Sequence, residues 1–197
     1  MNSTSRFSAF SLAVLSLLIV ACNPTTPAVT IDRSNRDTVA DAILDAFAEQ
    51  DWDTLALYIS DDGVRFTPHT YVHVDTDQTF AAENITDFGT DNTVKTWGTQ
   101  EGSGFPIDMT NMQYFDRYVW DHDYRDADEV RFDTVQDYGS VIDNTQDVYP
   151  GSSVIEYHFD GFDEQYGGMD WRSLRIVLQY DGAEFWLVGV IHDEWAP

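Results

Sequence analysis

Two histidines near the carboxyl end of the chain carry the side chains best suited to proton transfer. His158 and His192 both stand in apolar, strand-like runs, and an imidazole titrates close to neutral pH. Either residue could therefore act as a general acid or base. The sequence places no nucleophile and no orienting group beside them, and a strand histidine can equally be a hydrogen-bonded structural residue. The catalytic assignment stays open, with His158 and His192 as the candidates.

Arg172 is the candidate anchor for a ligand. It ends a face that also carries Leu174 and Ile176, and an unpaired charge is costly to bury beside apolar side chains. Either an anion or polar ligand satisfies the guanidinium, or an ion pair does so and fixes the strand register, with Asp170, Asp193 or Glu156. Aromatic side chains provide large contact areas in a core or around a ligand. The aromatic candidates for ligand binding are Trp171, Trp97 and Tyr58.

Metal and cofactor chemistry finds little support in the sequence. His69 and His73 stand in a β-like run, where four residues span about 13 Å, whereas zinc ligands converge to about 2 Å from the metal. The acidic run at residues 121–129 suggests a calcium loop but has Arg125 at the fifth position and Asp126 at the sixth, where an oxygen ligand and glycine belong. Nucleotide-binding, zinc-protease and serine-hydrolase motifs are missing. We expect no metal and no cofactor.

The charge balance of the chain is strongly acidic. The 197 residues include 35 Asp and Glu against 10 Lys and Arg, a formal net charge of −25. Such a surface disfavours nucleic acid and anionic lipid, both of which require basic side chains. The acids either bind a cation or cationic partner, or form the solvated coat of a salt-adapted protein. Their spread along the whole chain favours the coat.

The first 21 residues read as a lipoprotein signal peptide. Arg6 precedes an apolar run from Ala9 to Ala21 that is too short to span a bilayer comfortably. The run ends in Ile-Val-Ala before Cys22, which resembles the lipobox of bacterial lipoproteins and implies cleavage before Cys22 and its acylation. Cys22 is the only cysteine of the chain. The alternative is an ordinary signal peptide with an accidental cysteine.

The resemblance also predicts where the chain resides. Asn23 follows the cysteine, in place of the Asp that usually retains lipoproteins at the inner membrane. We therefore expect anchoring through lipidated Cys22 outside the cytoplasm, at the periplasmic side of the outer membrane if the cell has one. Residues 22–30 form a polar, proline-containing tether, and residues 31–197 form one domain.

The organising element of that domain is a predicted β-hairpin over Gly168–Trp195. Asp181-Gly182 between alternating apolar runs is a strong signal for a two-residue turn. In that register Leu178 faces Phe185, Arg172 faces Ile191 and Trp171 faces His192. Large side chains on both faces place the hairpin at the centre of a sheet that is covered on each side.

The remaining elements follow from caps and periodicity. Ser34 and Asp37 resemble a capping box before a helix with apolar spacing, and Asp51 caps a second, short helix. Asp75 or Asp77 is predicted to cap a helical segment through Phe80 and Ile85, and Thr110–Gln113 is a second capping box. Strands are predicted at 64–67, 70–75, 93–99, 130–135 and 153–159. Helices followed by long antiparallel strands indicate an α+β fold.

Two short blocks carry a family resemblance. Asp51-Trp-x-x-Leu-x-x-Tyr58-Ile59 and Asp62-Gly-Val-Arg-Phe66 resemble the opening of nuclear-transport-factor-2-like, or cystatin-like cone, domains. The runs 63–68, 168–175 and 190–195 are similar to an uncharacterised group of bacterial lipoproteins. The resemblance implies a curved antiparallel sheet wrapped around amino-terminal helices, with a pocket at the open end.

The functional expectation follows from the leader, the cone and the missing catalytic motifs. We expect a lipid-anchored module that binds a small molecule or an envelope protein without transforming it. The alternative is a small-molecule isomerase or dehydratase, which the resemblance also implies, with His158 or His192 as general base and Arg172 steadying a developing negative charge. A purely structural envelope protein with a filled cone is the third option.

Overall fold

The first helices form where the apolar spacing predicts them. The computed structural model describes residues 31–134 and 142–195, so the leader, Cys22 and the whole tether lie outside the described residues. Helix α1 spans Arg36–Glu49 and α2 spans Trp52–Ala56. Asp51 caps α2 as predicted. The predicted cap of α1 is wrong by one residue, because Asn35 accepts the Thr38 amide and the Ser34 hydroxyl donates to Asp32 instead.

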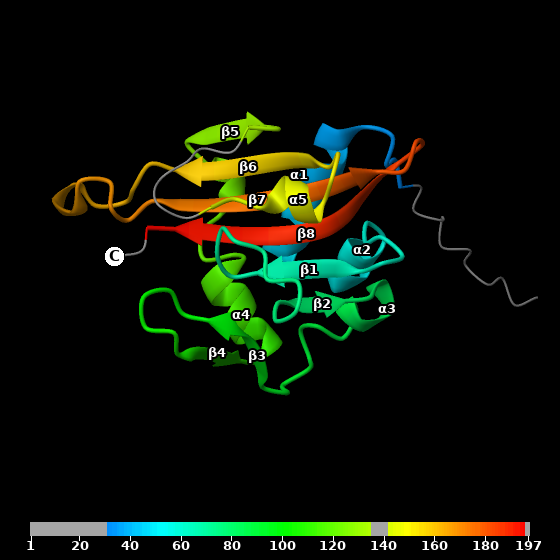
Figure 1. The fold of residues 1–197 in the computed structure, drawn as a ribbon. Coiled ribbons are helices and arrows are strands. Elements are labelled where there is room, and N and C mark those ends of the chain that lie inside the picture. Colours follow the sequence, from blue (N-terminus) through cyan, green and yellow to red (C-terminus); the bar gives the residue numbers. More distant parts are fainter. Residues whose placement is uncertain (1–30, 135–141, 196–197) are drawn as a thin grey trace, which may run out of the picture. The chain divides into compact units, whose positions relative to one another are not determined.

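A six-stranded curved sheet forms the body of the domain (Figure 1). Its strands, in the order β2-β1-β8-β7-β6-β5, are Gln78–Phe80, Val64–Thr67, Phe185–Glu194, Arg172–Tyr180, Ser153–Phe159 and Glu129–Phe132. Neighbouring strands are antiparallel except β1 and β8, which run parallel. The β7–β8 hairpin is central, as predicted, and the α+β fold class is confirmed.

The register of the central hairpin differs from the two-residue-turn prediction. The loop covers residues 181–184, where the Asp181 carboxylate accepts the amides of Ala183 and Glu184, so Tyr180 faces Phe185. A bulge after Val177 then shifts the pairing again. Arg172 consequently pairs with Glu194, and His192 pairs with Leu174 on the same side of the sheet. The total shift is three residues, an odd number, so each side chain of β8 lies on the opposite face of the sheet from the one predicted.

The middle of the chain departs furthest from the predictions. Residues 70–75 form turns and not a strand, and Asn144 holds this loop by bonding both the amide and the carbonyl of Val72. The predicted helix cap at Asp75 or Asp77 is also wrong, because the segment leads into β2, and Asp77 instead accepts the Thr67 hydroxyl. The helices α3 and α5 are single turns, at Ala82–Ile85 and Thr145–Val148, and short 3₁₀ turns η1 and η2 lie at Tyr124–Asp126 and Glu164–Tyr166.

Two other local predictions for the middle, the strand at 93–99 and the helix after Thr110, are confirmed. The first forms β3 (Lys95–Thr99), which pairs with β4 (Pro106–Met109), a strand that was not predicted, as a separate two-stranded sheet. Helix α4 (Asn111–Tyr118) begins with the predicted capping box, in which Thr110 accepts the Gln113 amide and Gln113 accepts the Thr110 amide. Strand β5 ends at Phe132, earlier than predicted, and residue 135 lies outside the described residues.

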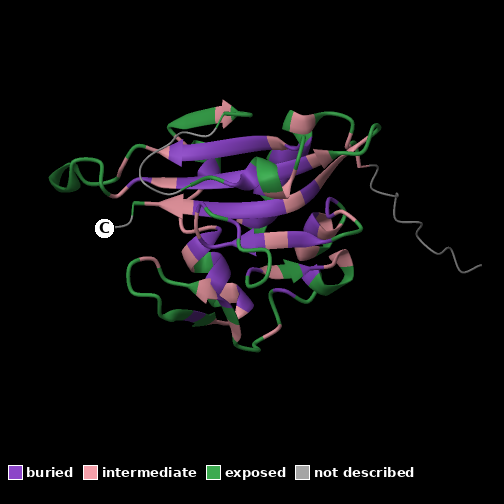
Figure 2. Cartoon of the chain, viewed as in Figure 1, coloured by how far each residue is buried: buried purple, intermediate pink, exposed green. Residues whose placement is uncertain are grey.

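The two faces of the six-stranded sheet are buried differently. Its inner face packs against α1, α2 and α4 through one large apolar cluster that includes Phe47, Phe66 and Tyr114. Its outer face carries a small apolar cluster around Val177 and Ile191 under α5, together with buried charged side chains. Burial is continuous along the central strands, as Figure 2 shows. The two sheet faces therefore offer different chemistry.

Candidate functional site

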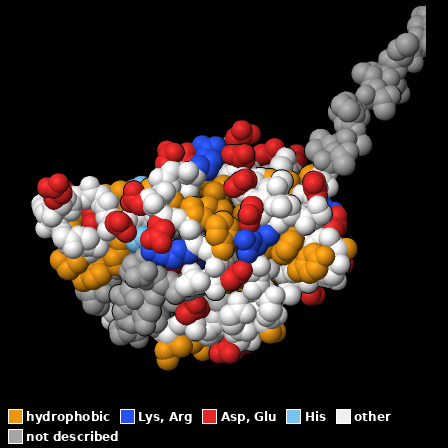
Figure 3. All heavy atoms as spheres, turned by 90° about the horizontal axis from the view of Figure 1, so that it is seen from above, with side chains coloured by type: hydrophobic (Ala, Val, Ile, Leu, Met, Phe, Trp, Pro, Cys, Tyr) orange, Lys and Arg blue, Asp and Glu red, His pale blue; other side chains and the backbone are white. Residues whose placement is uncertain are grey.

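A pocket opens where α1 meets the edge strand β5. Its volume is about 580 Å³, which is in the usual range for small-molecule sites. We call it the α1–β5 pocket, and its walls are Asp37, Asp41, Leu44, Asp45, Arg125, Val130, Phe132 and Tyr157. Figure 3 looks onto this edge and shows apolar side chains gathered between acidic and basic ones. The pocket is therefore lined by both apolar and charged side chains.

Helix and strand periodicity explain the two walls. Asp37, Asp41 and Asp45 recur every four residues on α1, so their side chains form one row along the helix. Val130 of β5 pairs with Tyr157 of β6, and Phe132 pairs with Ile155, so Val130, Phe132 and Tyr157 share the inner sheet face. The pocket thus has an acidic helical wall and an apolar, aromatic sheet wall.

Arg172 lies at the end of the inner face but is paired differently from the prediction. Its Nε lies 2.9 Å from Asp121 Oδ2 and its Nη1 2.5 Å from Glu194 Oε2, while the predicted partners Asp170, Asp193 and Glu156 are elsewhere. Glu194 also accepts from Arg117. The guanidinium is therefore satisfied within the protein, so it needs no ligand to compensate its charge.

His192 is packed beside this ion-pair cluster. Its side chain is 0 % exposed, its ring meets Tyr118 edge-on, and Nε2 lies 3.5 Å from Glu194 Oε2. Burial alone would raise the pKa of Glu194, but the neighbouring His192 ring and the hydrogen bond and positive charge of Arg117 hold it well below its usual value. A histidine and an acid are thus neighbours here, although neither lines the α1–β5 pocket.

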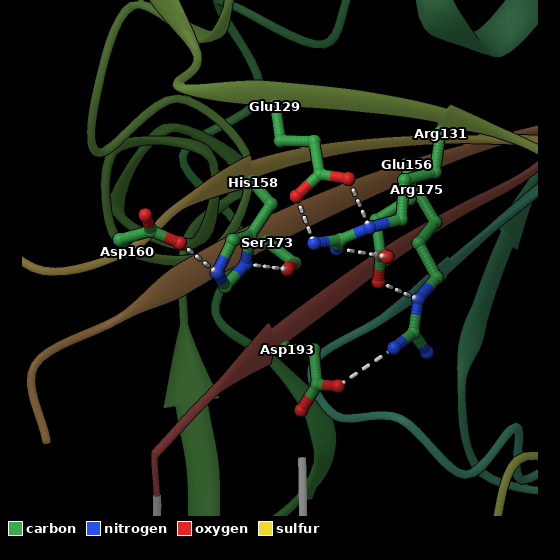
Figure 4. Close-up of polar contacts among 8 residues, drawn as sticks. All are labelled: Glu129, Arg131, Glu156, His158, Asp160, Ser173, Arg175 and Asp193. Atoms are coloured by element: carbon green, nitrogen blue, oxygen red, sulfur yellow. Dashed lines mark hydrogen bonds and ion pairs between the residues drawn. The ribbon is translucent and has the colours of Figure 1, made fainter. Parts of the chain in front are cut away.

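The outer face carries a ladder of alternating charges across four strands (Figure 4). Arg175 donates to Glu156 at 2.9 Å and to Asp193 at 2.8 Å, and Arg131 donates to the other Glu156 oxygen at 3.1 Å and contacts Glu129. Two of the acids that the sequence offered to Arg172, Glu156 and Asp193, therefore pair with Arg175, which the register shift moves opposite Ile191, and the third, Asp170, accepts two backbone amides. The ladder joins β5, β6, β7 and β8 by side chains as well as backbone.

His158 belongs to this outer face. Its Nδ1 lies 2.8 Å from Ser173 Oγ and its Nε2 3.4 Å from Asp160 Oδ1, as Figure 4 shows. Burial and the nearby charge of Arg131 lower its pKa, so the ring is neutral at neutral pH. The order of serine, histidine and acid is that of a hydrolase triad, but Ser173 is fully buried. The group links β6 to β7 and presents no nucleophile to a substrate.

The predicted aromatic residues lie in three separate places. Trp97 is fully buried and stacks on Tyr114 with 3.8 Å between ring centroids, and Tyr58 is buried in the same inner cluster. Trp171 is buried near His158 on the outer side. None of the three lines the α1–β5 pocket, and their role in ligand binding stays a prediction.

The residues that line the pocket were not predicted from the sequence. Asp37, Asp41 and Asp45 were read as part of a dispersed acidic coat, although their spacing of four residues on an amphipathic helix was a usable signal. Nothing in the sequence placed Tyr157 or Val130 opposite them, because β5 meets α1 only in the folded chain.

The described part of the chain has neither a cluster of metal ligands nor a helix that could span a membrane. In residues 31–134 and 142–195, no three His, Cys, Asp or Glu side chains come together in a way that would hold a metal ion. His69 lies against the Thr99 carbonyl, 3.0 Å from its Nε2. Within the same ranges, no helix has the length and apolar character needed to cross a bilayer.

Comparison with known proteins adds a fold likeness. No protein-family model and no curated protein matches the chain. One matching solved structure is a designed nuclear-transport-factor-2-like protein, titled Rd1NTF2_05 with five substitutions, at 13 % identity. The match covers 79 % of this chain and 94 % of that chain, with a TM-score of 0.34. The description of the fold as a cone-like α+β domain rests on its own curved sheet and packed helices.

Proposed function

We propose that this chain is a lipid-anchored extracytoplasmic module that binds a small molecule in the α1–β5 pocket. The pocket itself is the observation that carries the proposal, because it provides about 580 Å³ between an apolar sheet wall and a charged helical wall. Mostly apolar cavities with a few placed polar groups are the usual form of small-molecule sites. Asp41, Leu44 and Val130 are the wall residues on which a test can be built.

The binding test fills the pocket. Val130 is half-exposed at its wall, so Val130→Trp should occupy the space without disturbing the buried core. The full chain, extracted from its own membrane in mild detergent, would be examined by native mass spectrometry for a bound small molecule. We expect the ligand to be lost in Val130→Trp and kept in Val94→Trp, a matched change at an exposed valine outside the pocket. Retention of the ligand in Val130→Trp would overturn the assignment of the pocket.

The anchor is tested separately at Cys22. The apolar run before this sole cysteine supports acylation, and the absence of Asp after it supports sorting to the outer membrane. Metabolic labelling with an alkynyl fatty acid should mark the wild-type chain and not Cys22→Ser. Asn23→Asp should move the labelled chain to the inner-membrane fraction. An unlabelled wild-type chain would refute the lipoprotein assignment and leave the binding assignment intact.

An isomerase or dehydratase is the second candidate, and the neighbouring His192 and Glu194 favour it. They are 3.5 Å apart beside Arg172, a set that could move a proton and steady an anion. This function requires substrate to reach His192, whose side chain is fully buried. Imidazole ¹⁵N spectra with and without a candidate substrate decide the matter: a substrate-dependent shift at His192, which lies outside the α1–β5 pocket, supports an enzyme, and an unchanged signal supports a binding module.

A further inference from the structure

We infer that the α1–β5 pocket takes an organic cation, an amine with an apolar body. This inference rests on the proposed function and names its ligand class. The acidic wall is the row of Asp37, Asp41 and Asp45, and the apolar body would lie against Val130 and Phe132.

The charges of the pocket are not balanced within the protein. Three carboxylates and the Arg125 guanidinium line it, and the Arg36 guanidinium pairs with Asp37 beside it, so these groups carry −3 + 2 = −1 when all are ionised. Asp37 pairs with Arg36 at 2.9 Å, and Asp45 pairs with Arg125 at 3.2 Å. Asp41 has no ion pair or hydrogen bond to any residue that the structure describes. Asp41, the middle carboxylate of the row, is therefore the one available to pair with a ligand.

The opposite wall supplies a polar atom without a partner. Tyr157 is only 5 % exposed and lines the pocket, yet its hydroxyl makes no hydrogen bond within residues 31–134 and 142–195. Burial, followed by the negative charges of Asp41 and Asp37, raises the pKa of Tyr157, so the phenol stays protonated and lies in the field of those carboxylates. The rest of the ring is buried, whereas the hydroxyl oxygen stays accessible from the pocket and has no partner in the described chain, so it is available to a ligand. An ammonium N–H would donate to its oxygen.

The spacing of the carboxylates distinguishes an organic cation from a metal ion. Eight residues separate Asp37 from Asp45, which is about 12 Å along a helix. No bare ion bridges that distance, and the described residues offer no convergent ligand set. The sheet wall already accepts a cation, since the Arg36 guanidinium lies 4.6 Å from the centroid of the Phe132 ring. An amine whose ammonium meets Asp41 and whose apolar body lies against Val130 fits the two walls of the pocket.

The test compares three probes that share one skeleton. The cation 2-phenylethylamine, the neutral 2-phenylethanol and the anion 3-phenylpropionate would be titrated against the full chain at low salt, with binding followed by saturation-transfer NMR. We expect the amine to bind about tenfold more tightly than the alcohol, the gain typical of one charge-assisted hydrogen bond, and the anion not to bind.

Matched variants then locate the effect. Asp41→Asn should remove the preference for the amine and leave the affinity for the alcohol unchanged, whereas Asp116→Asn, at an exposed position of α4 outside the pocket, should change neither. Tyr157→Phe should weaken the amine by about tenfold, the loss of one hydrogen bond from a charged donor. Circular dichroism confirms that each variant is folded.

The outcomes separate the inference from the proposed function. Equal binding of amine and alcohol, or an unchanged preference in Asp41→Asn, would overturn the cation inference while the pocket remains a binding site. Binding that persists equally in Val130→Trp would overturn both, because the probes would then occupy another part of the chain. Absence of binding by all three probes would likewise overturn both.

Discussion

The ladder of charges on the outer face should make Arg175 a strong determinant of stability. Its side chain is 1 % exposed and donates to Glu156 and Asp193. Arg175→Met keeps a similar length and removes the charge, which leaves Asp193 without its arginine partner. Breaking a buried ion pair typically costs about 3–5 kcal/mol. Because Glu156 keeps its contact with Arg131, we expect the lower end, about 3 kcal/mol.

The assay is urea unfolding followed by tryptophan fluorescence, with the melting temperature as a second measurement. For a domain of this size, a loss of about 3 kcal/mol lowers Tm by about 6–12 °C. Arg125→Met is the control, because Arg125 is an exposed arginine whose ion pairs are worth about 1 kcal/mol or less. The two variants should therefore differ by about 2 kcal/mol or more in free energy of unfolding.

A double variant tests the cause of the loss. If Arg175→Met destabilises because it leaves buried carboxylates uncompensated, adding Glu156→Gln should cost less than the sum of the two single changes. Strict additivity would show that the ladder is not a coupled network. A loss of less than 1 kcal/mol for Arg175→Met, similar to that of the surface control, would refute the reasoning about the ladder altogether.

Three further predictions concern single interactions. Glu194 has a lowered pKa in the folded state, so its ionised form stabilises the fold above its ordinary pKa of 4.5 and this contribution is lost as pH falls below that value. Glu194→Gln should therefore unfold at lower urea than wild type at pH 7, and a gap that fails to narrow towards pH 3 would contradict this. Thr110→Ala should cost about 1 kcal/mol of unfolding free energy by removing the capping box of α4, and an unchanged urea midpoint would contradict that role. Gly63→Ala should destabilise the fold more than Gly182→Ala. Both glycines have positive φ, but only at Gly63 would the new Cβ lie 2.7 Å from a backbone oxygen, that of Phe80. Equal losses of Tm in the two variants would show that this close approach is relieved.

Much of the local structure follows from residues close together in the sequence. The capping box at Thr110 and the cap at Asp51 formed as predicted, because each hydrogen bond closes over three residues of its own segment. The apolar spacing of α1 also predicted which of its residues are buried, and the alternation in β7 and β8 predicted a central hairpin.

Interactions between distant segments determined the rest. One bulge after Val177 and a longer loop at residues 181–184 changed the face of His192 and the partner of Arg172. The run at 70–75 has strand-like composition, but Asn144, 72 residues away from Val72, holds it as a loop. The α1–β5 pocket likewise exists only where β5 lies beside α1.

The sequence by itself determined the helices α1, α2 and α4, the central hairpin and the α+β class, since caps and periodic burial are local or one-dimensional properties. Tertiary structure alone decided the strand register, the partners of each buried charge and the position of the pocket. The physical reason is that register and charge pairing minimise the free energy of several strands together, so no single segment contains the information.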